Sequence, residues 1–152
     1  MDSPSAQGTI LVVNGPNLNL LGTREPSTYG TATLSDVEQV ATDAAERNGY
    51  TCRFVQSNHE GALIDAIHEA RSDCAAIVIN AGAYTHTSVA LRDAIAAVAL
   101  PTIEVHISNV HKREEFRHHS YLSAVSEAVI VGAGIQGYAL AIDHIAHKLT
   151  ER

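Results

Sequence analysis

The sequence predicts an α/β domain built on a parallel sheet, and three observations favour that class. The chain has 152 residues, 45% hydrophobic and 18% charged, which is enough apolar side chain for a compact core and too much for intrinsic disorder. Short β-branched runs alternate with segments of helical periodicity. No linker or repeat interrupts this alternation, so we expect one domain over residues 1–152, with residues 1–8 as a disordered tail.

The first half of the chain predicts strand, helix, strand and helix in that order. Residues 9–14 (TILVVN) are short and β-branched, end at a Gly/Pro/Asn segment and predict a buried strand. Thr33 is a good N-cap for a helix that starts at Leu34 and stops near Gly49. Residues 50–57 (YTCRFVQS) alternate partly, as strands near a sheet edge do. The second helix is marked at helical spacing by Leu63, Ile64, Ile67 and Ala70.

The second half continues the same alternation. Residues 75–80 (AAIVIN) predict a third strand and residues 89–98 a third helix. Residues 101–108 (PTIEVHIS) predict a fourth strand that opens at a proline, and residues 128–131 (AVIV) a fifth. Residues 135–149 form the predicted closing helix.

Repeated strand–helix pairs imply parallel strands, right-handed crossovers and helices on both faces of the sheet. This is a doubly wound, flavodoxin-like arrangement, and we take the strand order 2-1-3-4-5 from that class. Ligands of such sheets bind beyond the carboxyl ends of the strands. The residues at those ends are therefore the first candidates for a functional site.

Composition excludes several classes of protein. The net charge of −7 disfavours binding to nucleic acid or to an anionic membrane, because the overall field repels phosphate. No apolar run approaches the roughly 18 residues of a membrane span, and the first eight residues lack the features of a signal peptide. Cys52 and Cys74 are not in a C-x-x-C motif, so we expect reduced core cysteines in a cytoplasmic protein.

Polar segments follow four of the predicted strands. They are NGPNLNLLGTREPSTYG (14–30), NAGAYTHTSVALRD (80–93), EVHISN (104–109) and GAGIQG (132–137). Asn and Gly also favour simple turns, which is the better interpretation of any one segment alone. For the four together, convergence at one sheet edge favours a site.

Two pairs in these segments suggest acid–base chemistry. Glu104 and His106 are i, i+2 on one strand and share a face, so the carboxylate can fix the imidazole tautomer and make His106 a proton donor. Arg24 and Tyr29 share a polar loop, in which a guanidinium can stabilise the anion of a phenol whose ordinary pKa is about 10. A surface loop anchor is the other interpretation of Tyr29.

Three other interpretations are weaker. GAGIQG matches a dinucleotide fingerprint, but it lies in the last strand–helix unit, and a tight turn for close helix packing fits better. Because of this motif and the flavodoxin-like fold, a flavin- or nucleotide-binding domain without catalysis is the alternative function. The histidines within residues 106–119 lack zinc-helix spacing, so we expect no metal. Residues 112–119 (KREEFRHH) mix both charge signs, as solvated helix faces do, although their arginines could reach an anionic ligand.

The four polar segments, with the continuation EVHISNVHKREEFRHHSYLS, closely resemble the type II 3-dehydroquinate dehydratases. The resemblance covers the chain from Ile10 to about Lys148. It implies anti elimination of water from 3-dehydroquinate to give 3-dehydroshikimate through an enolate, without cofactor or metal. The same step serves the shikimate pathway to aromatic amino acids and quinate breakdown, and the sequence does not separate these roles.

The resemblance also implies catalytic roles. Tyr29 stands where the family's base does, and Arg24 where the cation that stabilises its anion does. Asn17 would hold a water against the enolate oxygen. His106, oriented by Glu104, would protonate the departing hydroxyl.

Substrate-binding roles follow in the same way. The resemblance implies that the ring hydroxyls are bound by Asn80, His86 and Arg117. The backbone of Ile107 and Ser108 would bind the carboxylate, and Arg113 would close with a lid formed by residues 17–30. Asp93 would reach into a neighbouring subunit's site, which implies a homo-oligomer, commonly a dodecamer built from trimers.

Overall fold

Five parallel strands form one sheet in the computed structural model, which describes residues 7–23, 27 and 30–151. The strand order is β2-β1-β3-β4-β5, which confirms the order expected for the fold class. The strands are β1 (Thr9–Asn14), β2 (Thr51–Gln56), β3 (Ala76–Asn80), β4 (Thr102–His106) and β5 (Ala128–Val131).

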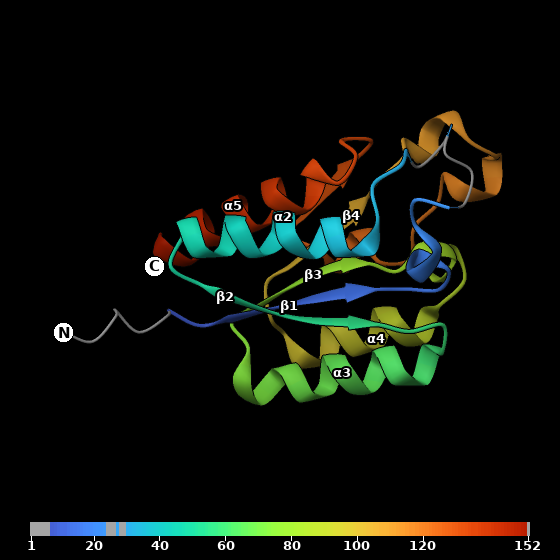
Figure 1. The fold of residues 1–152 in the computed structure, drawn as a ribbon. Helices are drawn as coiled ribbons and strands as arrows, with labels where there is room; N and C mark the ends of the chain where they lie inside the picture. Colours follow the sequence, from blue (N-terminus) through green and yellow to red (C-terminus); the bar gives the residue numbers. More distant parts are fainter. Residues whose placement is uncertain (1–6, 24–26, 28–29, 152) are drawn as a thin grey trace.

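Two layers of helices cover the sheet (Figure 1). On one face lie α2 (Leu34–Arg47) and α5 (Gln136–Thr150), and on the other α3 (Glu60–Asp73) and α4 (Val89–Val98). Alternate residues of the central strands enter the two cores because side chains of a strand point to opposite faces. In β1, for example, Val12 packs towards α2 and α5, and Val13 towards α3 and α4.

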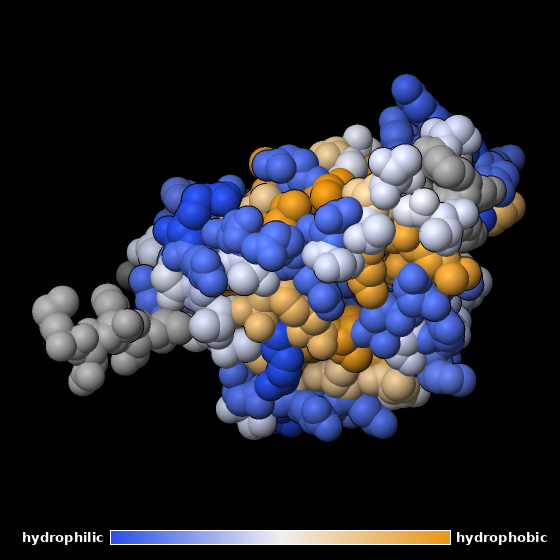
Figure 2. Space-filling model, viewed as in Figure 1, coloured by the Kyte–Doolittle hydropathy of each residue, from blue (hydrophilic) through white to orange (hydrophobic). Residues whose placement is uncertain are grey.

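The sequence explains where α2 begins and why β2 lies at the edge of the sheet. Thr33 caps α2 as predicted, since its side chain accepts from the Asp36 backbone and the Asp36 carboxylate accepts from the Thr33 backbone. The partial alternation of β2 marks an edge strand, and its residues are only partly buried. Apolar side chains reach the surface along β2, between α2 and α3 (Figure 2).

The glycine-rich turn after β5 brings α5 close to the sheet. A Cβ on Gly137 would lie 3.2 Å from Val105 Cγ1 and 3.5 Å from Ile130 Cγ2, so only glycine allows this approach without a shift of the neighbours. The prediction that GAGIQG serves helix packing is thereby confirmed. Gly132 and Gly134 in the same turn have positive φ angles, which glycine adopts at little cost.

The structure corrects the sequence-based description in three places. The predicted strand 101–108 ends at His106, and the segment from 109 to 125 folds into short 3-10 helices in place of one solvated helix. Gln7 donates to Gly49 O and Gly8 O accepts from Thr51, so the predicted tail does not extend to these two residues; residues 1–6 lie outside the described part. Both cysteines are free but only partly buried.

Burial raises the pKa of the Cys52 thiol to about 11, which keeps it protonated and unreactive near neutral pH. None of the helices in the described part of the chain is long and apolar enough to span a bilayer.

Candidate active site

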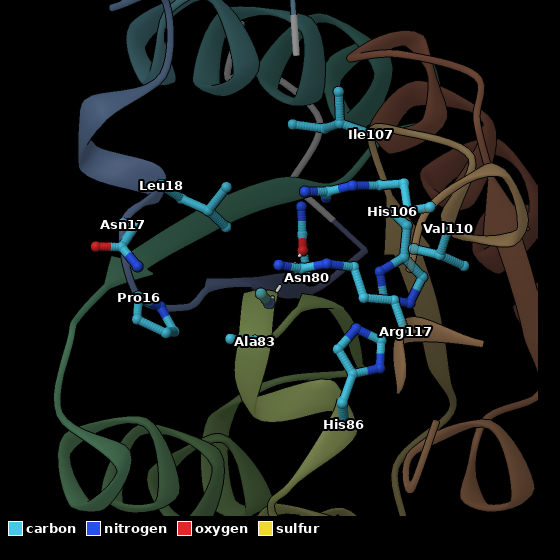
Figure 3. A pocket seen from close by; sticks show the side chains of 12 residues that line it. Pro16, Asn17, Leu18, Asn80, Ala83, His86, His106, Ile107, Val110 and Arg117 are labelled. Atoms are coloured by element: carbon cyan, nitrogen blue, oxygen red, sulfur yellow. Dashed lines mark hydrogen bonds between the residues drawn. The ribbon is translucent and has the colours of Figure 1, made fainter. Parts of the chain in front are cut away.

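The carboxyl ends of β1, β3 and β4 open onto one cavity (Figure 3). This is where the doubly wound fold places ligands, because the helices that follow neighbouring strands leave on opposite faces there. Most of the predicted site residues within the described part of the chain line this cavity: Asn17, Asn80, His86, His106, Ile107, Arg113 and Arg117.

Glu104 and His106 form a buried pair at the end of β4. His106 Nε2 lies 2.5 Å from Glu104 Oε2, and both side chains are almost fully buried. The carboxylate can only accept, so Nε2 carries the proton and Nδ1 is left to serve a ligand. The shared face predicted from their spacing is confirmed.

Two hydroxyls complete the environment of Glu104. Ser120 donates to Oε2 at 2.8 Å and Ser123 to Oε1 at 2.6 Å. Burial acts to raise the pKa of Glu104, but the hydrogen bonds from His106, Ser123 and Ser120 outweigh it and leave the pKa lowered. The carboxylate therefore stays ionised at neutral pH. Neither serine is predicted from the sequence, although a buried carboxylate indicates that further donors must be near.

His86 and His106 both line the cavity, and their rings lie next to each other. The two rings stack with centroids 6.4 Å apart, and His86 Nδ1 lies 2.8 Å from the carbonyl oxygen of His119. A carbonyl only accepts, so Nδ1 carries the proton. Burial lowers the pKa of His86, partly offset by the bond to His119. His86 is therefore neutral at pH 7 and presents Nε2 as a hydrogen-bond acceptor.

Asn80 ends β3 beside Asn14, its register partner on β1. Its Nδ2 donates to the Tyr138 hydroxyl at 3.0 Å, and its Oδ1 accepts from Gly82 N at 3.2 Å. The Tyr138 hydroxyl donates to Asn14 Oδ1 at 2.6 Å. Burial raises the pKa of Tyr138, which remains a neutral phenol. Asn80 is 4% exposed and still reaches the cavity wall.

Two arginines supply positive charge at the cavity. The Nε atoms of Arg117 and Arg113 lie 3.0 and 3.7 Å from the same Glu114 carboxylate oxygen, and both side chains are mostly buried. The cavity therefore suits an anionic ligand, in spite of the net charge of −7.

The other predicted residues differ in where they lie, and Asn17 lines the cavity on its far side. Asn17 is exposed at φ 68° and lies across the cavity from the two histidines (Figure 3). Asp93 is exposed on α4, and neither it nor Ser108 is a lining residue. Arg24 and Tyr29 fall outside the described residues.

A second hollow adjoins the first behind the Glu104–His106 pair. It is lined by His111, His118 and His119, among others. Across residues 7–23, 27 and 30–151, no three His, Cys, Asp or Glu side chains are grouped as a metal site would require.

Comparison with known proteins gives a single family. A family model described as "Dehydroquinase class II" matches residues 8–146. The chain is 62% identical over 141 residues to "Catabolic 3-dehydroquinase 2" of Aspergillus flavus, which covers 93% of this chain and 94% of the relative. It is 59% identical over 143 residues to "3-dehydroquinate dehydratase 2" of Pseudomonas putida, covering 94% and 96%.

Solved structures agree with these relatives. A type II dehydroquinase from Butyrivibrio crossotus superposes with a TM-score of 0.88 at 48% identity, covering 91% of this chain and 97% of that one. A type II dehydroquinase from Propionibacterium acnes gives a TM-score of 0.89 at 41% identity, covering 95% and 99%.

Proposed function

The chain belongs to the class II dehydroquinase family, and from that premise we propose that it dehydrates 3-dehydroquinate to 3-dehydroshikimate through an enolate. One observation of the site carries the proposal. The buried Glu104–His106 pair faces a cavity that also holds two arginines, so a proton donor and an anion-binding charge meet at one place.

The elimination needs a base and an acid on different segments of the chain. Tyr29, as a phenolate stabilised by Arg24, takes the proton from the carbon alpha to the ketone, and the C–H electron pair forms the enolate. A water held by Asn17 stabilises the enolate oxygen. The enolate then collapses and the C–O bond breaks. The hydroxyl takes a proton from Nδ1 of a doubly protonated His106, whose other proton stays on Nε2 towards Glu104, and leaves as water.

The remaining cavity residues bind the substrate. Asn80, His86 and Arg117 hold the ring hydroxyls, and the backbone at Ile107 and Ser108 holds the carboxylate. Arg113 closes over the ligand with the loop of residues 17–30. The cavity charge described above supports this assignment, because the substrate is an anion.

We propose a homo-oligomer, a dodecamer built from trimers, in which Asp93 reaches a neighbouring subunit's site. Relatives carry both general and catabolic names, so the proposal covers the reaction and leaves two metabolic settings, the shikimate pathway and quinate breakdown. Deleting the gene from its own host, and then measuring growth on quinate and growth without aromatic amino acids, distinguishes the two.

A direct assay tests the function. Purified protein with a metal chelator present is mixed with 3-dehydroquinate, and formation of the conjugated enone appears as rising ultraviolet absorbance. Tyr29→Phe and His106→Ala should each lower kcat by about 10²–10⁴-fold while the protein stays folded, the usual contribution of one acid or base. Tyr50→Phe, a buried tyrosine outside the lining residues, is the matched control. A fully active Tyr29→Phe protein overturns the assignment of the base.

A further inference from the structure

A chain of three buried polar side chains runs behind the cavity wall. Asn14 comes from β1, Asn80 from β3 and Tyr138 from α5, and each is at most 4% exposed. Nδ2 of Asn80 donates to the Tyr138 hydroxyl at 3.0 Å, and that hydroxyl donates to Asn14 Oδ1 at 2.6 Å. Of the three, only Asn80 lines the cavity.

The hydrogen-bond donors and acceptors of these three side chains fit together in one way. The backbone N–H of Gly82 can only donate, so it must meet the oxygen of the Asn80 amide, as it does at 3.2 Å. The nitrogen of that amide therefore faces Tyr138. The single hydroxyl proton of Tyr138 goes to Asn14, which leaves an oxygen lone pair for Asn80. Rotating the Asn80 amide by 180° would break the bonds to Gly82 and Tyr138 together.

This arrangement decides what Asn80 offers a ligand. One hydrogen of Nδ2 is used by Tyr138, and the second remains for the cavity, so Asn80 acts there as a donor. At the same cavity His86 presents an acceptor, because its Nδ1 hydrogen is donated to His119 O. A hydroxyl that accepts from Asn80 and donates to His86 matches both, whereas an ether or a methylene at that place does not.

We propose that Tyr138 is a positioning residue that holds the Asn80 amide as a donor towards one ring hydroxyl of the substrate. The inference rests on the proposed function, since it assigns a role in binding 3-dehydroquinate. Tyr138 does not touch the ligand itself, and its effect passes through Asn80.

The test compares Tyr138→Phe with the wild type on three substrates. These are 3-dehydroquinate and its analogues that lack either the 4- or the 5-hydroxyl. On 3-dehydroquinate we expect KM to rise about tenfold with kcat nearly unchanged, the size of one lost hydrogen bond. On one of the two deoxy analogues, the variant and the wild type should have equal kcat/KM. A purely structural defect would lower activity on all three substrates alike.

Further variants make the outcomes decisive. Tyr50→Phe removes a hydroxyl from another buried tyrosine and should change none of the three KM values. Asn80→Ala should raise KM, and adding Tyr138→Phe to it should raise KM no further. If Tyr138→Phe fails to fold, Asn14→Ala takes its place, because it frees the Tyr138 proton to turn towards Asn80.

Two failures are distinguishable. A wild type that does not turn over 3-dehydroquinate overturns the proposed function. An active wild type together with a folded Tyr138→Phe of unchanged KM, or of raised KM on every substrate, overturns the role of Tyr138 and leaves the function intact.

Discussion

Glu104 is a carboxylate without solvent contact, and its neighbours explain how the fold tolerates it. An unpaired buried charge would cost several kcal/mol, but His106, Ser120 and Ser123 all hydrogen-bond to its two oxygens. The pair of oxygens is thus held in one orientation. Since the imidazole takes its own orientation from Oε2, the serines act on His106 through Glu104.

Ser123→Ala tests this arrangement through pH. The pKa of Glu104 is lowered from the ordinary value of 4.5, so its contribution to stability is present above about pH 4.5 and is lost as the pH falls through the folded value. Removing the Ser123 donor raises the folded pKa again. We expect a cost of about 1–3 kcal/mol at pH 7, measured by urea unfolding, and a cost that decreases as the pH falls through the folded pKa of Glu104.

Ser126→Ala is the control for this experiment. Ser126 lies on the same segment and is also partly buried, but its hydroxyl donates to the Leu122 carbonyl and not to Glu104. The loss in the free energy of unfolding caused by Ser126→Ala should not change as Glu104 titrates. A cost of Ser123→Ala that stays constant as the pH falls through the folded pKa of Glu104 would contradict the role assigned to Ser123.

Single residues were predictable from sequence where the signal was local. Glu104 and His106 stand two apart on a strand, which alone places them on one face. Ser120, Ser123 and Tyr138 reach the site through loops and a closing helix, and no spacing rule connects them to β3 or β4. Their partners on β3 and β4 lie between 16 and 58 residues away, so only the folded chain shows the contacts.

At the scale of elements, the turn after β1 fixes how the first loop enters the site. Gly15 follows the last residue of β1, and its N–H donates to the Asn80 carbonyl at 2.8 Å. A Cβ on Gly15 would overlap the backbone carbonyl of Ala81. The ends of β1 and β3 can therefore approach only because position 15 has no side chain.

Gly15→Ala should for this reason destabilise the protein strongly, by about 2–4 kcal/mol, because a backbone carbonyl cannot move aside as a flexible side chain can. Gly61→Ala is the matched control: Gly61 lies in α3, where a Cβ would meet nothing within 4 Å. There alanine should stabilise by about 0.5–1 kcal/mol. Chemical denaturation of both variants checks the pair, and a mild effect of Gly15→Ala would show that the two strand ends can separate.

Helices and strands with a continuous hydrophobic pattern were predictable from the sequence, and the short 3-10 helices were not. β1, β5 and α4 have the predicted bounds, because a β-branched run or a helical stripe extends over their whole length. The 3-10 helices within residues 110–125 are three residues long each and leave no repeat to detect. That segment nevertheless carries Arg113, Arg117 and both serines, so the least predictable stretch supplies much of the site.

At the scale of the whole molecule, the placement of Asp93 bears on assembly. Asp93 is exposed on α4 and does not line the cavity of its own subunit. If it contributes to catalysis, as proposed, it must do so across an interface. β5 is the edge strand beside β4, and its exposed Val129 gives that side an apolar residue for a partner.

Mixing two impaired variants tests whether sites are shared between subunits. Asp93→Ala should lower kcat/KM about tenfold or more without changing the melting temperature, and His106→Ala is expected to be nearly inactive. When the two are unfolded together and refolded as hybrids, an Asp93→Ala subunit supplies an intact His106 and its neighbour supplies an intact Asp93. Random assembly then restores about a quarter of the sites, so activity should exceed that of the unmixed proteins. Mass spectrometry confirms that the hybrids contain both variants. If their activity is only the sum of the activities of the two variants, Asp93 lies outside any neighbouring site, because a shared site requires that one subunit complete the cavity of another.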